Sequence, residues 1–138
     1  MLSKSGKRWG FSQPLEGVGT LSRLRPIVAI LPVSPPGDPV QLVGKWQRTD
    51  GGYIMELNNP TFDGRLTAAY FNPRPINVSR SGWVLEDGNL LVFVELRDQG
   101  YPGSTYTLAH QPDTDRLVGI YFQAAAQQQF EVVFERIE

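Results

Sequence analysis

Residues 42–72 read LVGKWQRTDGGYIMELNNPTFDGRLTAAYFN, and their pattern decides the fold. Short stretches rich in Leu, Ile, Tyr and Phe alternate here with turn signals, DGG at 50–52 and DG at 63–64. Glycine tolerates the positive φ of a tight reversal, so each Asp-Gly favours a turn between antiparallel strands. No helical period with caps is present. The stretch predicts three strands, over 42–48, 53–58 and 65–72.

The same alternation continues to the end of the chain. It predicts further strands over 76–85, 90–97, 104–110, 116–123 and 129–136. Connections this short join antiparallel neighbours, because a parallel crossover needs about a dozen residues or more. A meander of this size removes its unpaired edges by closing on itself. The predicted fold is all-β, a single eight-stranded antiparallel up-and-down barrel over residues 41–138.

Residues 1–40 hold no such period, and we expect an irregular N-terminal extension there. Basic residues within 4–8 precede an apolar run at 24–33 and the turn-forming SPPGDP at 34–39. That order loosely follows an export signal, which leaves a periplasmic or secreted location and a cytoplasmic one both open. No stretch reaches the roughly 20 apolar residues of a membrane span.

Composition excludes several classes of function. The chain has 13 Lys and Arg against 14 Asp and Glu, so no basic surplus points to nucleic acid. It has no Cys, which excludes disulfides, thiolate metal sites and cysteine nucleophiles. His110 is its single histidine, and we expect it at the surface or an edge. With no nucleophile elbow, phosphate loop or metal-ligand spacing, we expect neither an enzyme nor a cofactor or metal site.

A motif at the head of the first strand carries a family resemblance. Gly44 and Trp46 form a Gly-x-Trp, and DGRLTAAY follows at 63–70. Together they resemble the calycin superfamily of barrels, which includes lipocalins, and most closely its avidin and streptavidin family, over residues 42–72. The resemblance implies that Trp46 plugs the closed end of the barrel and that Arg136 packs over its ring.

The biotin site of that family is not retained. Avidins place an Asn two residues after the motif Trp, where this chain has Arg48. They place a Ser after the next turn, where this chain has Gly52, and a Ser or Thr two residues after the motif Tyr, where it has Asn72. Only Tyr70 matches. A site stripped of its polar partners is not expected to recognise biotin.

A different site is predicted at the end opposite the Trp floor, because barrel ligands enter by an open mouth. Arg48 faces inward there and needs either a carboxylate partner, water at the rim or an anionic ligand. Tyr70 and Asn72 share its inward face, Tyr101 lies in the QGYPG turn, and Gln123 ends a strand nearby; each could equally be core edge or loop packing. The turns gathered at this mouth are 49–52, 72–75, 98–103 and 124–128.

Two functions remain open. The mouth favours a non-catalytic barrel that binds an unknown small molecule, anionic or amphipathic. Strand 90–97 is apolar on both faces, so we expect its outer face to be covered by the N-terminal segment or by a second subunit. This face favours the alternative function, a protein-interaction or inhibitor module, or a homo-oligomer. Gly82 further predicts a β-bulge in the strand 76–85.

Overall fold

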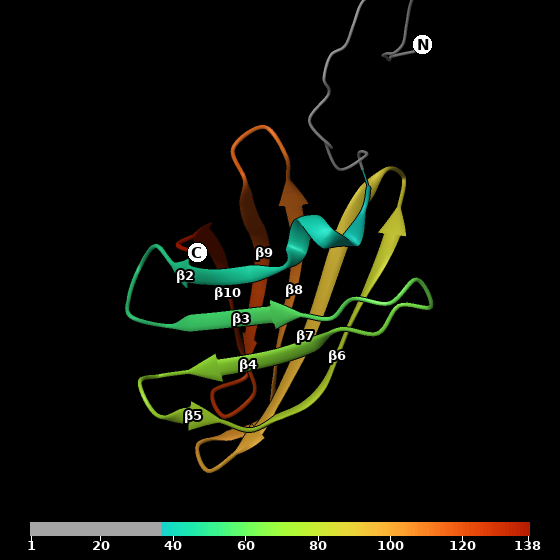
Figure 1. The fold of residues 1–138 in the computed structure, drawn as a ribbon. Helices are drawn as coiled ribbons and strands as arrows, with labels where there is room; N and C mark the ends of the chain where they lie inside the picture. Colours follow the sequence, from blue (N-terminus) through green and yellow to red (C-terminus); the bar gives the residue numbers. More distant parts are fainter. Residues whose placement is uncertain (1–36) are drawn as a thin grey trace, which may run out of the picture. The chain divides into compact units, whose positions relative to one another are not determined.

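The computed structural model describes residues 37–138, which form an all-β, antiparallel, up-and-down barrel that is nearly closed (Figure 1). A 3-10 helix, η1 (Pro39–Leu42), precedes the strands, so regular structure begins shortly before residue 41. The predictions of an irregular extension and an export signal concern residues that largely lie outside the described ones. Within residues 37–138 no helix has the length and apolar character needed to cross a membrane. The strands are β2 (Gly44–Arg48), β3 (Ile54–Asn58), β4 (Thr67–Phe71), β5 (Pro75–Ile76), β6 (Val78–Glu86), β7 (Asn89–Asp98), β8 (Tyr101–Gln111), β9 (Arg116–Gln123) and β10 (Gln128–Arg136).

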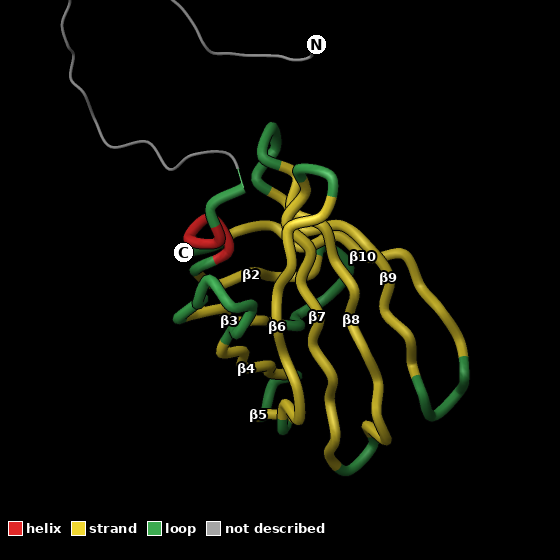
Figure 2. The backbone as a smooth tube through the Cα atoms, turned by 90° about the vertical axis from the view of Figure 1, so that its right-hand side faces the viewer, coloured by secondary structure: helices red, strands yellow, loops and turns green. Residues whose placement is uncertain are grey.

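The strands follow one another as a meander, and the first of them pairs with the last. Their order in the sheet is β5-β4-β3-β2-β10-β9-β8-β7-β6, and all neighbours are antiparallel. Trp46 on β2 pairs with Arg136 on β10, which brings the beginning and end of the barrel together. Figures 1 and 2 show β2–β5 as one wall and β6–β10 as the other, with the first wall running across the second.

The barrel closes between β6 and the segment before β4. An isolated bridge joins Arg65 to Gly82, and a Cβ added to Gly82 would lie 3.0 Å from the carbonyl oxygen of Gly64. Glycine therefore permits the close backbone approach at this seam. The bulge predicted at Gly82 is wrong, because the register shift of β6 lies between Val78 and Arg80.

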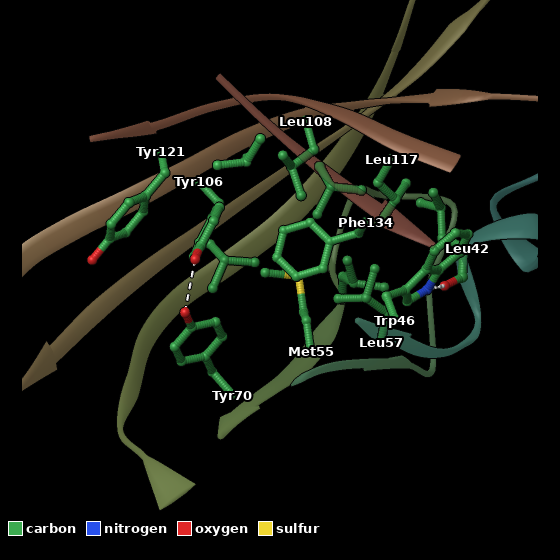
Figure 3. Close-up of a cluster of buried hydrophobic side chains, with 14 of the residues drawn as sticks. Leu42, Trp46, Met55, Leu57, Tyr70, Tyr106, Leu108, Leu117, Tyr121 and Phe134 are labelled. Carbon is green, nitrogen blue, oxygen red and sulfur yellow. Dashed lines mark hydrogen bonds between the residues drawn. The ribbon is translucent and has the colours of Figure 1, made fainter. Parts of the chain in front are cut away.

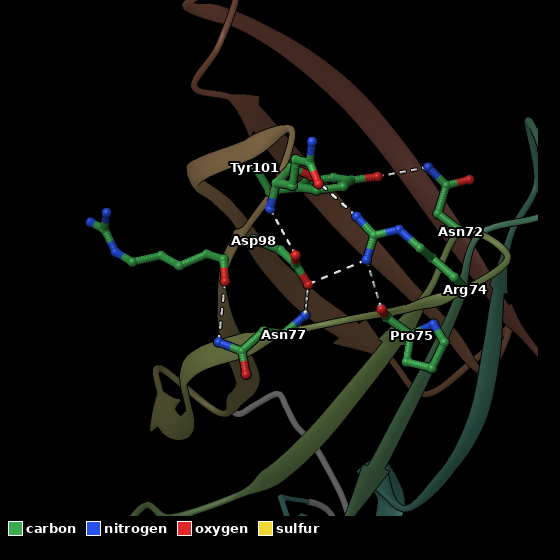
Figure 4. Close-up of polar contacts among 8 residues, drawn as sticks. Asn72, Arg74, Pro75, Asn77, Asp98 and Tyr101 are labelled. Atoms are coloured by element: carbon green, nitrogen blue, oxygen red, sulfur yellow. Dashed lines mark hydrogen bonds and ion pairs between the residues drawn. The ribbon is translucent and has the colours of Figure 1, made fainter.

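The predicted strand 76–85 is two strands, which makes nine rather than eight. Asn77 interrupts it by donating its backbone N–H to Asp98 Oδ2 at 2.7 Å and its side-chain Nδ2 to the Arg97 carbonyl at 3.1 Å (Figure 4). Arg74 adds a bond from Nη2 to the carbonyl oxygen of Gln99 at 3.2 Å. Side chains thus join this corner of the barrel to the β7–β8 turn where the strand ladder stops.

The interior is filled by the inward faces that strand alternation predicts (Figure 3). Trp46 is fully buried, and its Nε1 donates to the Leu42 carbonyl at 3.0 Å. On β7 the inward residues Leu90, Val92, Val94 and Leu96 are buried, while the outward Leu91 and Phe93 are only half-buried. The largest fully buried side chains are Trp46, Tyr70, Tyr106, Phe134, Leu42, Met55, Leu57, Leu96, Leu108 and Leu117.

Candidate functional site

A pocket of about 520 Å³ opens at the end of the barrel predicted to be the mouth. Each of the four turns at that end contributes to it or borders a strand residue that does. Arg48, Asn72, Tyr101 and Gln123, four of the predicted ligand residues, line it. The remaining lining residues are Asp50, Tyr53, Gly100, Tyr121 and Phe130.

Arg48 lies in the floor of this pocket and is only 8% exposed. Its Nε and Nη2 donate to the two carboxylate oxygens of Asp50 at 2.8 and 2.7 Å, and its Nη1 donates to the Tyr106 hydroxyl at 2.9 Å. The guanidinium carbon lies 4.1 Å from the ring centre of Tyr53 and 5.5 Å from that of Tyr121. Burial by itself would lower the pKa of Arg48, but the hydrogen bonds to Asp50 and Tyr106 outweigh it and raise the pKa.

Of the partners predicted for Arg48, the structure has the protein carboxylate. The hydrogen bonds from Arg48 also lower the pKa of Asp50, so both groups are charged at neutral pH. Because Asp50 neutralises the charge of Arg48, the arginine does not require an anionic ligand. Asp50 follows Arg48 by two residues in the β2–β3 turn, and this closeness in the sequence was the signal that the sequence reasoning missed.

Tyr70, also predicted to bind ligand, lies in the core and does not line the pocket. Its hydroxyl is 2.7 Å from that of Tyr106, which links it to Arg48. Burial raises the pKa of Tyr106 to about 12 although its bonds to Tyr70 and Arg48 oppose the shift. Burial also raises the pKa of Tyr70. Both phenols are neutral at pH 7 and neither can act as a general base there.

Asn72 and Tyr101 meet on one side of the mouth. Asn72 Nδ2 donates to the Tyr101 hydroxyl at 2.6 Å, which joins the end of β4 to the start of β8 (Figure 4). Asp98 lies behind this pair. The backbone N–H groups of Asn77 and Gln99 donate to its carboxylate and lower its pKa. These contacts hold one side of the mouth in a single arrangement.

Gln123 and Phe130 stand on the other side of the mouth. The Gln123 amide makes no hydrogen bond to any side chain or loop in the part of the chain that is described, so it is available to a ligand. Phe130 lines the pocket at the rim and is 43% exposed. Sequence reasoning missed Tyr53, which directly precedes β3, and Tyr121, which lies on β9.

The closed end contains the predicted structural residues. The Arg136 guanidinium lies 4.2 Å from the centre of the Trp46 ring, the contact that the calycin resemblance implied. Gly44 has a φ of +143°, and a Cβ there would overlap the carbonyl oxygen of Glu138 and lie 2.6 Å from Arg136 Nη1. A glycine before the Trp therefore leaves room for the arginine.

His110 belongs to this closed end and is 6% exposed, so the prediction of a surface or edge histidine is wrong. Its ring packs edge-on against Trp46, and its Nε2 is 3.0 Å from Asp115 Oδ1. Asp115 also accepts from Arg136 Nε at 2.6 Å, and this bond is the main cause of its lowered pKa. The carboxylate supplies the polar partner that lets a histidine be buried.

Nothing outside the chain identifies the site. No protein-family model, curated protein or solved structure matches the sequence. Among residues 37–138, no three His, Asp or Glu side chains gather in a way that could hold a metal ion. A barrel fold by itself does not define a function, so the chemistry of the mouth pocket has to carry the interpretation.

Proposed function

We propose that this protein is a non-catalytic barrel that binds a small molecule in its mouth pocket. The observation that carries the proposal is the pocket itself, about 520 Å³ in volume. Small-molecule sites typically measure about 300–1,000 Å³ and combine apolar walls with a few converging polar groups. Aromatic rings and the side chains of Arg48, Asp50, Asn72 and Gln123 meet here in that way.

The lining favours an amphipathic ligand over an anion. The positive charge of Arg48 is already matched by Asp50, so an incoming anion would compete with a bidentate ion pair. The rings of Tyr53, Tyr121 and Phe130 offer apolar surface beside these polar groups. A ligand with an apolar face and several uncharged polar groups uses both kinds of surface.

We further propose that the barrel is of the calycin type and nearest to the avidins in its first strands. The proposal rests on the Gly44 and Trp46 motif together with the cover of the Trp ring by Arg136. It concerns the architecture alone, since the residues that would recognise biotin are replaced.

The test places a bulky side chain in the pocket and compares its effect with that of the same substitution outside the pocket. Gln123→Trp places a large ring in the mouth. Gln111→Trp makes the same change at an exposed position at the end of β8 that lies away from the mouth. A fragment library containing neutral, anionic and aromatic compounds would be screened against the full chain by ligand-observed NMR. We expect compounds that bind the wild type and Gln111→Trp but lose binding to Gln123→Trp. If no compound binds, or if all binding survives Gln123→Trp, the proposal fails.

A second candidate is an interaction module acting through the outer face. Val84, Leu91 and Phe93 line an outward groove of about 310 Å³ over β6 and β7, and Val84 is largely exposed. Exposed apolar surface of this kind marks contact sites in many proteins. Light scattering on the full chain tests self-association: a dimer that Val84→Asp dissociates would support this use. A single-chain mass at every concentration would exclude a homo-oligomer.

A further inference from the structure

The charged groups of the mouth pocket cancel one another. Arg48 and Asp50 are the lining residues that carry charge at neutral pH, and they form a bidentate pair. Behind the rim, Arg74 Nη1 lies 3.5 Å from Asp98 Oδ2, so this second pair also cancels. A charged ligand would meet no surplus of opposite charge, and electrostatic complementarity therefore selects a neutral one.

Spare hydrogen-bonding capacity remains at the floor of the pocket. The Arg48 guanidinium makes three bonds to protein acceptors and retains further N–H groups. Each carboxylate oxygen of Asp50 accepts one bond from Arg48, and the side chain is 57% exposed, so lone pairs remain available. The pair thus offers donors and acceptors next to each other.

The side chains at the rim also offer both hydrogen-bond donors and acceptors. Asn72 uses its Nδ2 on Tyr101 and keeps its carbonyl oxygen, while the Tyr101 hydroxyl accepts that bond and keeps its own proton to donate. The Gln123 amide offers both a donor and an acceptor. A ligand hydroxyl also donates and accepts, so neighbouring hydroxyls can pair with all these groups and leave none unsatisfied.

An aromatic face is free at the rim. One neighbour of the Tyr121 ring is Tyr106, stacked at 4.5 Å between centres, and the Tyr53 ring is covered by Arg48 at 4.1 Å. Phe130, by contrast, is 43% exposed and makes no ring contact within the described part of the chain. A sugar ring combines an apolar C–H face, which packs on such a ring, with an edge of adjacent hydroxyls.

From this combination we propose that the mouth pocket binds a neutral carbohydrate, a mono- or disaccharide. The inference rests on the proposed small-molecule function and specifies its ligand class. The sugar's C–H face lies on Phe130, its vicinal hydroxyls bond to the Arg48–Asp50 pair, and its outer hydroxyls meet the amides of Asn72 and Gln123. Because the pocket is open to solvent, hydroxyls that point outward stay hydrated.

The experiment measures glycoside binding to the full chain. Methyl glucoside, methyl galactoside, methyl mannoside, maltose and lactose would be titrated by saturation-transfer NMR and calorimetry, with glucuronate as the anionic probe and adenine as the planar one. Phe130→Ala should weaken glycoside affinity about twofold to tenfold, the range expected for loss of one ring contact. Phe62→Ala is the matched control, since Phe62 is 88% exposed in the β3–β4 turn at the opposite end.

The outcomes separate this inference from the function on which it rests. Glycoside binding that weakens in Phe130→Ala and is unchanged in Phe62→Ala supports both. If adenine or glucuronate binds in a Phe130-dependent way and no glycoside does, the carbohydrate inference is wrong and the small-molecule site stands. If no probe of any class binds, both fall. Glycoside binding that is equal in wild type, Phe130→Ala and Gln123→Trp places the sugar elsewhere and overturns the inference.

Discussion

The hydroxyl pair of Tyr70 and Tyr106 beneath the pocket gives a quantitative test of its polar floor. Tyr106→Phe would remove the acceptor for Arg48 Nη1, at 2.9 Å, and the partner of the Tyr70 hydroxyl, at 2.7 Å. Tyr70 and Tyr106 are 1% and 0% exposed, so water cannot replace the lost partner of the Tyr70 hydroxyl. Because an orphaned buried polar group costs about 1–3 kcal/mol, we expect Tyr106→Phe to lower the free energy of unfolding by about 2–3 kcal/mol.

Tyr70→Phe should cost less, because the Tyr106 hydroxyl would still bond to Arg48. We expect a loss of about 1 kcal/mol, the net value of one ordinary hydrogen bond. In the double variant no phenol is left unpaired. Its cost should therefore fall short of the sum of the single costs by about 1 kcal/mol, which is the coupling between the two hydroxyls.

Urea unfolding followed by tryptophan fluorescence measures all three values, since Trp46 is fully buried and reports on the core. Tyr101→Phe is the control, because its hydroxyl bonds to Asn72 at the hydrated rim and its loss should cost under about 1 kcal/mol. Additive costs of Tyr70→Phe and Tyr106→Phe, within about 0.5 kcal/mol, would refute the coupled network.

Three further predictions concern the barrel as a whole. The raised pKa of Tyr106 means that its contribution to stability is complete below about pH 10 and is lost as the pH rises towards about 12. An alkaline urea titration should show the loss, and Tyr106→Phe should reduce it, while the part that comes from the buried Tyr70 remains. Gly119→Ala should destabilise by about 1–3 kcal/mol, because the added Cβ would overlap the carbonyl oxygen of Thr107, whereas Gly52→Ala meets no atom and should change the unfolding midpoint little. Asp115 has a lowered pKa, so its contribution to stability is present above about pH 4 and is lost as the pH falls through the pKa of the folded state. Asp115→Asn should lower the free energy of unfolding by about 1 kcal/mol at neutral pH, a value reduced because the side chain is partly exposed. An equal loss at pH 2 and at pH 7 would contradict this assignment.

Strand positions in this protein follow from local sequence. The predicted strand 116–123 coincides with β9, and 129–136 differs from β10 by one residue. Alternation decides which side chains enter the core, and the Asp-Gly signals decide where the chain reverses. Both effects act between residues a few positions apart, so the pattern alone predicts them.

The split at Asn77 could not be predicted in this way. Its partner Asp98 lies at the far end of the β6–β7 hairpin, and the contact depends on the register in which these two strands pair. Gly82 shows the same limitation: an isolated glycine in a strand fits a bulge or a close backbone approach equally well. The bridge to Arg65, made by another part of the chain, decides between them.

Within the candidate site, the sequence indicated the mouth and several of its residues but not their pairing. Inward alternation and the turn positions pointed to Arg48, Asn72 and Tyr101. The same alternation placed Tyr70 in the pocket, although the residue lies in the core below it. Alternation gives the direction of a side chain and not its depth in the barrel. Depth depends on how far neighbouring strands extend past a residue.

The sequence by itself thus determined the all-β meander, the inward faces and the end at which the barrel opens, because these depend on chain stereochemistry and on apolar alternation. Tertiary structure alone decided that Arg48 is joined to Tyr106 and that His110 is buried beside Trp46. Hydrogen bonds and ion pairs act over a few ångströms. Arg48 and Tyr106, like His110 and Trp46, come from separate strands, and only the folded barrel sets the distances between them.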